Sequence, residues 1–255
     1  MFYEPLGGGR YSSTVHTTGP WSQKTQHLGP PSALLVREME ALPCSAPMMI
    51  ARVTMEILGP VPVGVLEVSA SVDRPGRSVE LLSATLSADG RVAVRARAWR
   101  IARSDTRSIA AEIDKPLAAP STGRVMTRPD GWGAGYLDVM EWRALEGSLG
   151  EPGPAVVWAR QGVPLVGDEE PTGLQRLLTV ADSGNGVSNR LDPRKWLFIN
   201  SELTVHVYRE PVGEWIALDA TTAIGPDGIG AAVTVLHDVE GAVGRGAQAL
   251  LIRPQ

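Results

Sequence analysis

The chain has a single cysteine, Cys44, among its 255 residues. One thiol excludes an intramolecular disulfide and a metal cluster built from cysteine thiolates. Apolar runs of the roughly 18 residues needed to cross a bilayer are also missing. The first residues, MFYEPLGGGRYSS, lack the basic start and apolar block of a secretory signal. From these absences we expect a cytoplasmic protein with no metal, no cofactor and no membrane insertion.

The sequence signals of several other kinds of functional site are missing as well. The net charge of −4 gives no general attraction to nucleic acid, so we expect no nucleic-acid partner. No serine stands in the Gly-x-Ser-x-Gly turn of the α/β-hydrolases, and Cys44 has no activating neighbours in the sequence. The glycines around Ile229 lack the strand–turn–helix context of a dinucleotide site. A covalent nucleophile is therefore disfavoured.

What the chain does contain is a loose repeat. Hydrophobic residues make up 43% and charged residues 20%, which is ordinary for a globular protein with a core. The stretch 202–253 resembles 52–103, with Thr204 answering Thr54, 150 positions earlier. Pro-Val-Gly at 62–64 also recurs at 211–213. Two similar halves at this spacing indicate a duplicated domain and not a short-period solenoid.

Each half shows the same order of elements. In the first half, a helix is predicted over 32–42, opened by Pro30-Pro31 and ended by Pro43. Four strands follow at 48–57, 63–72, 78–87 and 92–101, separated by Gly-Pro, Pro-Gly and Asp-Gly turns. In the second half, a strand at 156–164 precedes a helix over 173–182, which we expect glycines to close with a left-handed cap. Strands are then predicted at 196–208, 215–222, 230–237 and 243–252.

The middle of the chain has no clear periodicity. Residues 104–153 are rich in Pro, Gly, Ser and Thr, although 136–142 are a candidate first strand of the second half. A connection of this length is unusual inside one compact domain. We therefore place an N-terminal domain at 1–110, a linker at 111–152 and a C-terminal domain at 153–255.

Four motifs accompany this pattern of one helix against an antiparallel sheet, made twice in one chain: LGPPSALL, ADSGNG, FINSELTVHVYREPVGEW and GRGAQALLIRP. Together they resemble the TesB-like acyl-CoA thioesterases, especially their actinobacterial subgroup, which have a double hotdog fold. The resemblance implies an α+β fold of two antiparallel sheets, each wrapping a central helix. It also implies hydrolysis of a fatty acyl-CoA substrate, and a homodimer.

The resemblance further implies a catalytic trio that fixes a water molecule. Carried over by motif, its members are Asp182 in VADSGNG, Asn200 in FINSEL and Gln248 in RGAQALL. The family has a small polar residue, often Thr or Ser, where this chain has Asn200. Asp182 would orient the water or take its proton, and the two amides would hold it. Without the resemblance, Asp182 would be interpreted as a helix-ending residue and Asn200 as a turn residue. Gln248 stands among apolar residues and therefore needs hydrogen-bond partners.

Donors for the developing oxyanion are expected at the start of the first helix, where the helix dipole favours negative charge. Pro30 and Pro31 have no N–H, so the candidates for substrate binding are Leu28, Gly29 and Ser32. Gly29 would allow a ligand to approach the backbone closely. His27 is a further candidate, although a histidine before a helix is more often structural.

Three other interpretations stay open. An enoyl-CoA hydratase of the same fold would use an Asp–His pair, and no histidine lies near Asp182 in the sequence. A non-catalytic protein that binds acyl thioesters or lipids is the second alternative, kept open by Asn200. The arginines between 91 and 107 are candidates for the coenzyme A phosphates, but a solvated strand face explains them more simply.

Overall fold

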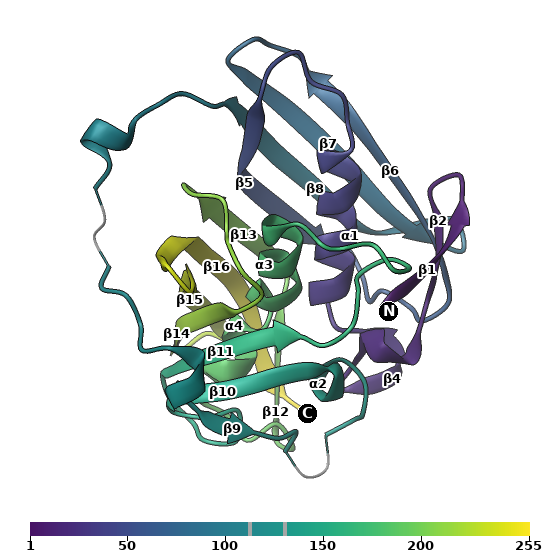
Figure 1. Cartoon of the computed structure of the whole chain (residues 1–255). Coiled ribbons are helices and arrows are strands. Elements are labelled where there is room, and N and C mark those ends of the chain that lie inside the picture. Colours follow the sequence, from purple (N-terminus) through teal and green to yellow (C-terminus); the bar gives the residue numbers. More distant parts are fainter. Residues whose placement is uncertain (112–113, 130–131) are drawn as a thin grey trace.

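The computed structural model describes residues 1–111, 114–129 and 132–255. Within these residues the chain forms a 14-stranded antiparallel sheet and a separate two-stranded hairpin (Figure 1). The strand order is β1-β2-β6-β7-β8-β5-β13-β16-β15-β14-β11-β10-β9, and β12 also pairs with β16. Strands of the first half therefore occupy one end of the sheet and strands of the second half the other.

The first half begins with two short hairpins and then contains one helix and four long strands. Its elements are β1 (Tyr3–Gly7), β2 (Arg10–Ser13), a 3-10 turn (Val15–Thr17), β3 (Thr18–Gly19), β4 (Ser22–Gln26), α1 (Gly29–Glu40), β5 (Met48–Ile57), β6 (Val65–Arg74), β7 (Val79–Ala88) and β8 (Arg91–Ala102). The predicted helix and four strands are all present. Alternation of buried and half-buried side chains along β7 explains why these strands could be predicted.

The second half repeats this order after an irregular connection with two 3-10 turns (Arg107–Ile109 and Pro120–Thr122). Its elements are β9 (Arg124–Met126), α2 (Tyr136–Val139), β10 (Met140–Glu146), β11 (Ala155–Gln161), α3 (Gly173–Ala181), α4 (Gly184–Val187), β12 (Trp196–Asn200), β13 (Glu202–Val207), β14 (Ile216–Ile224), β15 (Ile229–Asp238) and β16 (Gly241–Pro254). The single strand predicted over 196–208 is divided at Ser201.

Part of the expected linker 111–152 belongs to the sheet. β10 pairs with β11, and β9 pairs with β10, so this segment supplies one end of the 14-stranded sheet. Both elements are short and follow a stretch without periodicity, which is why the sequence pattern did not reveal β9. The domain boundaries themselves stay a prediction.

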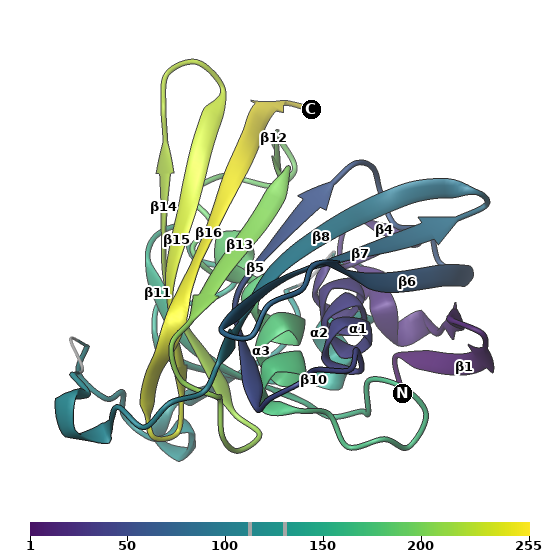
Figure 2. The same ribbon diagram turned by 90° about the horizontal axis from the view of Figure 1, so that it is seen from above.

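The two halves are joined by the antiparallel pairing of β5 with β13, as Figure 2 shows. Thr204 lies directly opposite Thr54 in this pair, and its hydroxyl donates to the Thr54 hydroxyl at 3.2 Å. The two residues that anchor the sequence repeat are thus neighbours across the junction. The expectation of two separate sheets is wrong, because this ladder makes the sheet continuous.

The helices α1 and α3 pack against each other on the same side of the sheet (Figures 1 and 2). Their backbones approach so closely that a Cβ on Gly29 would lie 2.1 Å from the Thr179 carbonyl oxygen. Every residue from Leu174 to Ala181 is buried, so α3 is a core helix. The N-terminus of α1 therefore meets the C-terminus of α3, and this junction positions the site described next.

Candidate functional site

Asp182 stands where α3 ends. The Thr172 hydroxyl caps the start of this helix by accepting a hydrogen bond from the Gln175 N–H at 3.2 Å. At the other end Asp182 keeps right-handed helical angles (φ −63°), and the chain continues into α4. The expected left-handed glycine cap is therefore wrong. Asp182 is buried, with a side-chain exposure of 7%, so its carboxylate needs hydrogen-bond donors.

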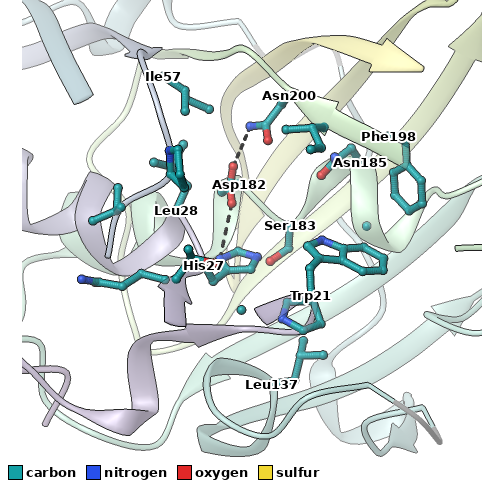
Figure 3. A pocket seen from close by; sticks show the side chains of 18 of the residues that line it. Trp21, His27, Leu28, Ile57, Leu137, Asp182, Ser183, Asn185, Phe198 and Asn200 are labelled. Atoms are coloured by element: carbon teal, nitrogen blue, oxygen red, sulfur yellow. Dashed lines mark hydrogen bonds and ion pairs between the residues drawn. The ribbon is translucent and has the colours of Figure 1, made fainter. Parts of the chain in front are cut away.

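Two amide side chains supply those donors. Asn200, the last residue of β12, donates from Nδ2 to Asp182 Oδ1 at 2.8 Å (Figure 3). Gln248 in β16 donates from Nε2 to the Asp182 main-chain oxygen at 3.1 Å and to Oδ1 at 3.3 Å. The three residues of the predicted trio thus meet at one carboxylate oxygen, and β16 pairs with β12 to hold the two amides in register.

The two amide side chains differ in whether their oxygen atom already accepts a hydrogen bond. The Gln248 Oε1 accepts the Asn185 N–H at 3.0 Å, and the side chain is 97% buried and does not line the pocket. A Cβ on Gly184 would lie 2.7 Å from the Thr234 hydroxyl oxygen and 3.1 Å from the Gln248 Oε1, so a glycine at this position lets α4 pack closely here. No described residue donates to the Oδ1 of Asn200, which does line the pocket. Within the described chain, Asn200 therefore presents an acceptor without a partner to the pocket, whereas Gln248 contacts Asp182 from outside the pocket lining.

His27 approaches the other oxygen of the same carboxylate. Its Nδ1 lies 3.4 Å from Asp182 Oδ2, and the same nitrogen accepts the Gly29 N–H at 3.0 Å (Figure 3). Burial lowers the pKa of His27 below its ordinary value, more than the nearby Asp182 charge raises it. No sequence pattern indicates this contact, because the two residues are far apart along the chain.

Tyr136 is a site residue that the sequence did not reveal. Its ring lies flat on the His27 ring, with centroids 3.9 Å apart and an interplanar angle of 8°. Its hydroxyl donates to the Thr179 carbonyl oxygen at 2.8 Å and lies 3.1 Å from the Ser183 hydroxyl oxygen. Burial is the main cause that raises the Tyr136 pKa well above its ordinary value, so the hydroxyl stays protonated. Tyr136 therefore fixes the plane of the imidazole.

These groups form the polar end of a pocket of about 260 Å³. Asp182, Ser183, Asn185 and Asn200 line that end, and the remaining wall is mainly apolar. Its larger side chains are Trp21, Ile57, Trp132, Leu137, Leu149 and Phe198. The Trp21 ring lies 5.2 Å from that of Trp132 and 5.5 Å from that of Phe198, so one hairpin turn, one loop and β12 contribute to an aromatic wall.

The predicted substrate-binding residues at the start of α1 do not all reach this pocket. The Gly29 N–H donates to His27 Nδ1, and the close contact of α1 with α3 leaves no room for a Cβ at Gly29. The Ser32 N–H donates to the Leu28 carbonyl oxygen, and Ser32 is fully buried. Leu28 and His27 line the pocket. In the described chain no acceptor is in hydrogen-bond geometry for the Leu28 N–H, so this donor stays available.

The sheet register identifies the first-half residues that are equivalent to the two amides. Asn200 pairs with Leu250 in the second half as Ile50 pairs with Arg100 in the first. Ala232 likewise pairs with Gln248 as Leu82 pairs with Ala98. The counterparts of Asn200 and Gln248 are thus Ile50 and Ala98, which donate no side-chain hydrogen bond. Arg100, expected on a solvated face, is buried and donates to Glu80 at 2.8 Å.

Comparison with known protein families gives two matches that together span most of the chain. The N-terminal domain of acyl-CoA thioesterases matches residues 17–101, and the C-terminal domain of acyl-CoA thioesterases matches residues 120–252. The chain belongs to the acyl-CoA thioesterase family. Comparison with curated protein sequences finds no match.

Solved structures show the same fold. A conserved protein of unknown function with a hot dog fold from Alicyclobacillus acidocaldarius is 15% identical, with a TM-score of 0.77 over 98% of this chain and 95% of its own. The acyl-CoA thioesterase II TesB2 from Mycobacterium marinum is 14% identical, with a TM-score of 0.69 over 99% of this chain and 95% of its own. The tesB protein of Mycobacterium avium subs paratuberculosis is also 14% identical, with a TM-score of 0.70 over 99% and 96%. The fold is a double hotdog, and none of the helices in the described residues has the length and hydropathy to span a membrane.

Proposed function

We propose that this protein hydrolyses the thioester of a fatty acyl-CoA by direct attack of a water molecule. The observation that carries the proposal is the Asp182 carboxylate, held by the amides of Asn200 and Gln248 at the polar end of an apolar pocket. Oδ1 accepts both amides, so Oδ2 is the oxygen left to accept a proton. Family membership supports the same reaction class.

The reaction needs a base, a positioned water and donors for the oxyanion. Asp182 Oδ2 takes one proton from the water as its oxygen bonds to the carbonyl carbon. The tetrahedral intermediate then releases the thiolate of coenzyme A, and the proton passes from Asp182 to the sulfur. The products are a free acid and a thiol, and the enzyme is returned to its starting state.

Each amide has a distinct role in this scheme. The Asn200 Oδ1 accepts the second hydrogen of the water, which is how an asparagine serves where the family often has a hydroxyl. Gln248 positions Asp182 and does not touch the water. The Leu28 N–H is the backbone donor proposed for the substrate, and the apolar wall from Trp21 to Leu149 receives the acyl chain.

A series of acyl-CoA substrates tests the proposal by release of free thiol. We expect turnover by the wild-type protein, with a preference among chain lengths that reflects the apolar wall. Binding of acyl-CoA without any thiol release, measured by calorimetry, would instead support the non-catalytic protein that binds acyl thioesters or lipids.

The contact of His27 with Asp182 favours one second candidate, hydration of an enoyl-CoA. The distance of 3.4 Å between His27 Nδ1 and Asp182 Oδ2 supplies the Asp–His pair that sequence separation had argued against. The products distinguish the two reactions, because hydration leaves the thioester intact and yields a hydroxyacyl-CoA. Mass spectrometry of a reaction with an enoyl-CoA therefore decides between them.

Other expectations remain predictions. They comprise the cytoplasmic location, the homodimer, the lack of a metal or cofactor and the lack of a nucleic-acid partner. Sedimentation equilibrium of the full chain tests the homodimer. A mass equal to that of one chain at micromolar concentration would contradict it.

A further inference from the structure

The two nitrogens of His27 are in different positions. Nδ1 accepts the Gly29 N–H at 3.0 Å, within the normal range for a hydrogen bond. The Asp182 oxygen at 3.4 Å lies beyond that range, so it is a neighbouring charge and not the acceptor of an Nδ1 proton. A nitrogen that accepts a hydrogen bond carries no proton. The single proton of a neutral imidazole must then sit on Nε2.

The surroundings keep this imidazole neutral and fixed. Tyr136 covers one face of the ring, and burial lowers the His27 pKa. The Gly29 N–H belongs to the first turn of α1, which is held against α3. The plane, tautomer and charge of the ring are therefore all set by the surrounding protein. The Nε2–H is the polar group of the ring that can still bind another molecule.

A purely structural role explains only half of this arrangement. Capping the Gly29 N–H uses Nδ1, but no described residue accepts the Nε2–H. The His27 side chain keeps 14% exposure and lines the pocket beside Leu28 and Ser183. In Figure 3 the ring edge away from Asp182 is turned toward the side where Ser183 and Trp21 lie. The unused donor thus faces the space where a thioester would bind.

We propose that His27, as the neutral Nε2–H tautomer, donates to the thioester carbonyl oxygen and stabilises the oxyanion during attack by water. This role rests on the proposed hydrolysis and adds a side-chain donor to it, whereas the sequence analysis expected only backbone donors at Leu28, Gly29 or Ser32. The proton stays on Nε2 throughout, so His27 is neither base nor nucleophile. A preorganised donor of this kind acts on the charge that develops in the transition state.

Two substitutions separate the two nitrogens. His27→Asn places an amide oxygen near the Nδ1 position and keeps an acceptor for Gly29, but it removes the donor to the pocket. His27→Gln places an amide N–H near the Nε2 position and loses the acceptor. If His27 is an oxyanion donor, His27→Asn lowers kcat about 10²–10³-fold with KM nearly unchanged, while His27→Gln retains much more activity. If His27 only caps α1, the order of the two variants reverses, and that result overturns the inference.

The tautomer of His27 is measured on the wild-type protein, so the result does not depend on the stability of a variant. Long-range 15N–1H spectra of the wild-type protein report which ring nitrogen carries the proton, and His27→Gln assigns the signal. We expect the neutral Nε2–H form at pH 7. An imidazolium or an Nδ1–H form would overturn the inference.

A third measurement separates this inference from the proposed function. If the wild-type protein hydrolyses no acyl-CoA, the proposed function fails, and the carbonyl stretch of bound 13C-labelled acyl-CoA then reports the donor directly. We expect the infrared band to shift to lower frequency on binding to the wild-type protein and to shift less with His27→Asn. An equal shift with both proteins would contradict the role of His27.

Discussion

Replacing Gln248 with leucine tests how the Asp182 carboxylate is held. Leucine is similar in size but removes both amide donors to Asp182 and the acceptor of the Asn185 N–H. Each buried polar group left unpaired costs about 1–3 kcal/mol, and Asn185 is half-buried, so water restores part of its loss. We expect a loss of stability on the order of 2–4 kcal/mol, which lowers Tm by roughly 5–15 °C.

The same substitution should lower kcat by roughly 10–100-fold, because Asp182 loses two of its positioning contacts. Leu236→Ala is the matched control. Leu236 is fully buried in β15, and its truncation costs about 2–5 kcal/mol, a similar loss of stability, without touching Asp182. Calorimetric unfolding and steady-state hydrolysis are measured on both variants. Wild-type kcat in Gln248→Leu, or an equal loss of kcat in Leu236→Ala, would refute the positioning role.

Three further predictions follow from the packing of the site. Gly29→Ala places a Cβ 2.1 Å from the Thr179 carbonyl oxygen, so we expect it to destabilise by more than about 2 kcal/mol in chemical unfolding, whereas Gly150→Ala, with nothing within 4 Å, should be neutral. Because the folded pKa of His27 lies below the ordinary value of 6.5, the unfolded chain binds more protons, and stability falls as the pH drops below about 6.5. His27→Gln should lose less stability over that interval in urea titrations at each pH, and an identical pH dependence would contradict it. Trp21→Ala should raise KM for the preferred acyl chain roughly tenfold by removing apolar contact, and an unchanged chain-length profile would show that the acyl chain binds elsewhere.

Much of the fold was predictable from local patterns. β5 has the predicted bounds, and the other long strands differ from the prediction by a few residues at their ends. Alternating burial and Gly- or Pro-containing turns are short-range signals, so they survive in the sequence. The repeat also identified Thr54 and Thr204 as equivalent. That these two residues pair with each other, and so merge two sheets into one, is a long-range contact that periodicity does not encode.

The candidate site could be predicted only for the residues that lie in a recognisable sequence motif. Asp182, Asn200 and Gln248 were placed by resemblance, and the structure brings their side chains together. The sequence did not predict the contact of His27 with Asp182, because distance along the chain says little about distance in the fold. Gly29 was predicted to lie close to a ligand because it has no side chain.

The reason for that glycine is the neighbouring helix. A Cβ at this position meets the α3 backbone, and only the packed pair of helices reveals this. Tyr136 was missed for a related reason. It lies in a stretch without periodicity, and its stacking on His27 depends on α2, which packs beside the β3–β4 hairpin.

The most direct test of the account is the rate of acyl-CoA hydrolysis by Asp182→Asn. The amide keeps the size of the carboxylate but cannot take a proton from water. We predict that kcat falls about 10²–10⁴-fold while the affinity for acyl-CoA, measured by calorimetry, is retained. A variant that hydrolyses acyl-CoA at the wild-type rate would contradict the claim that Asp182 activates the attacking water.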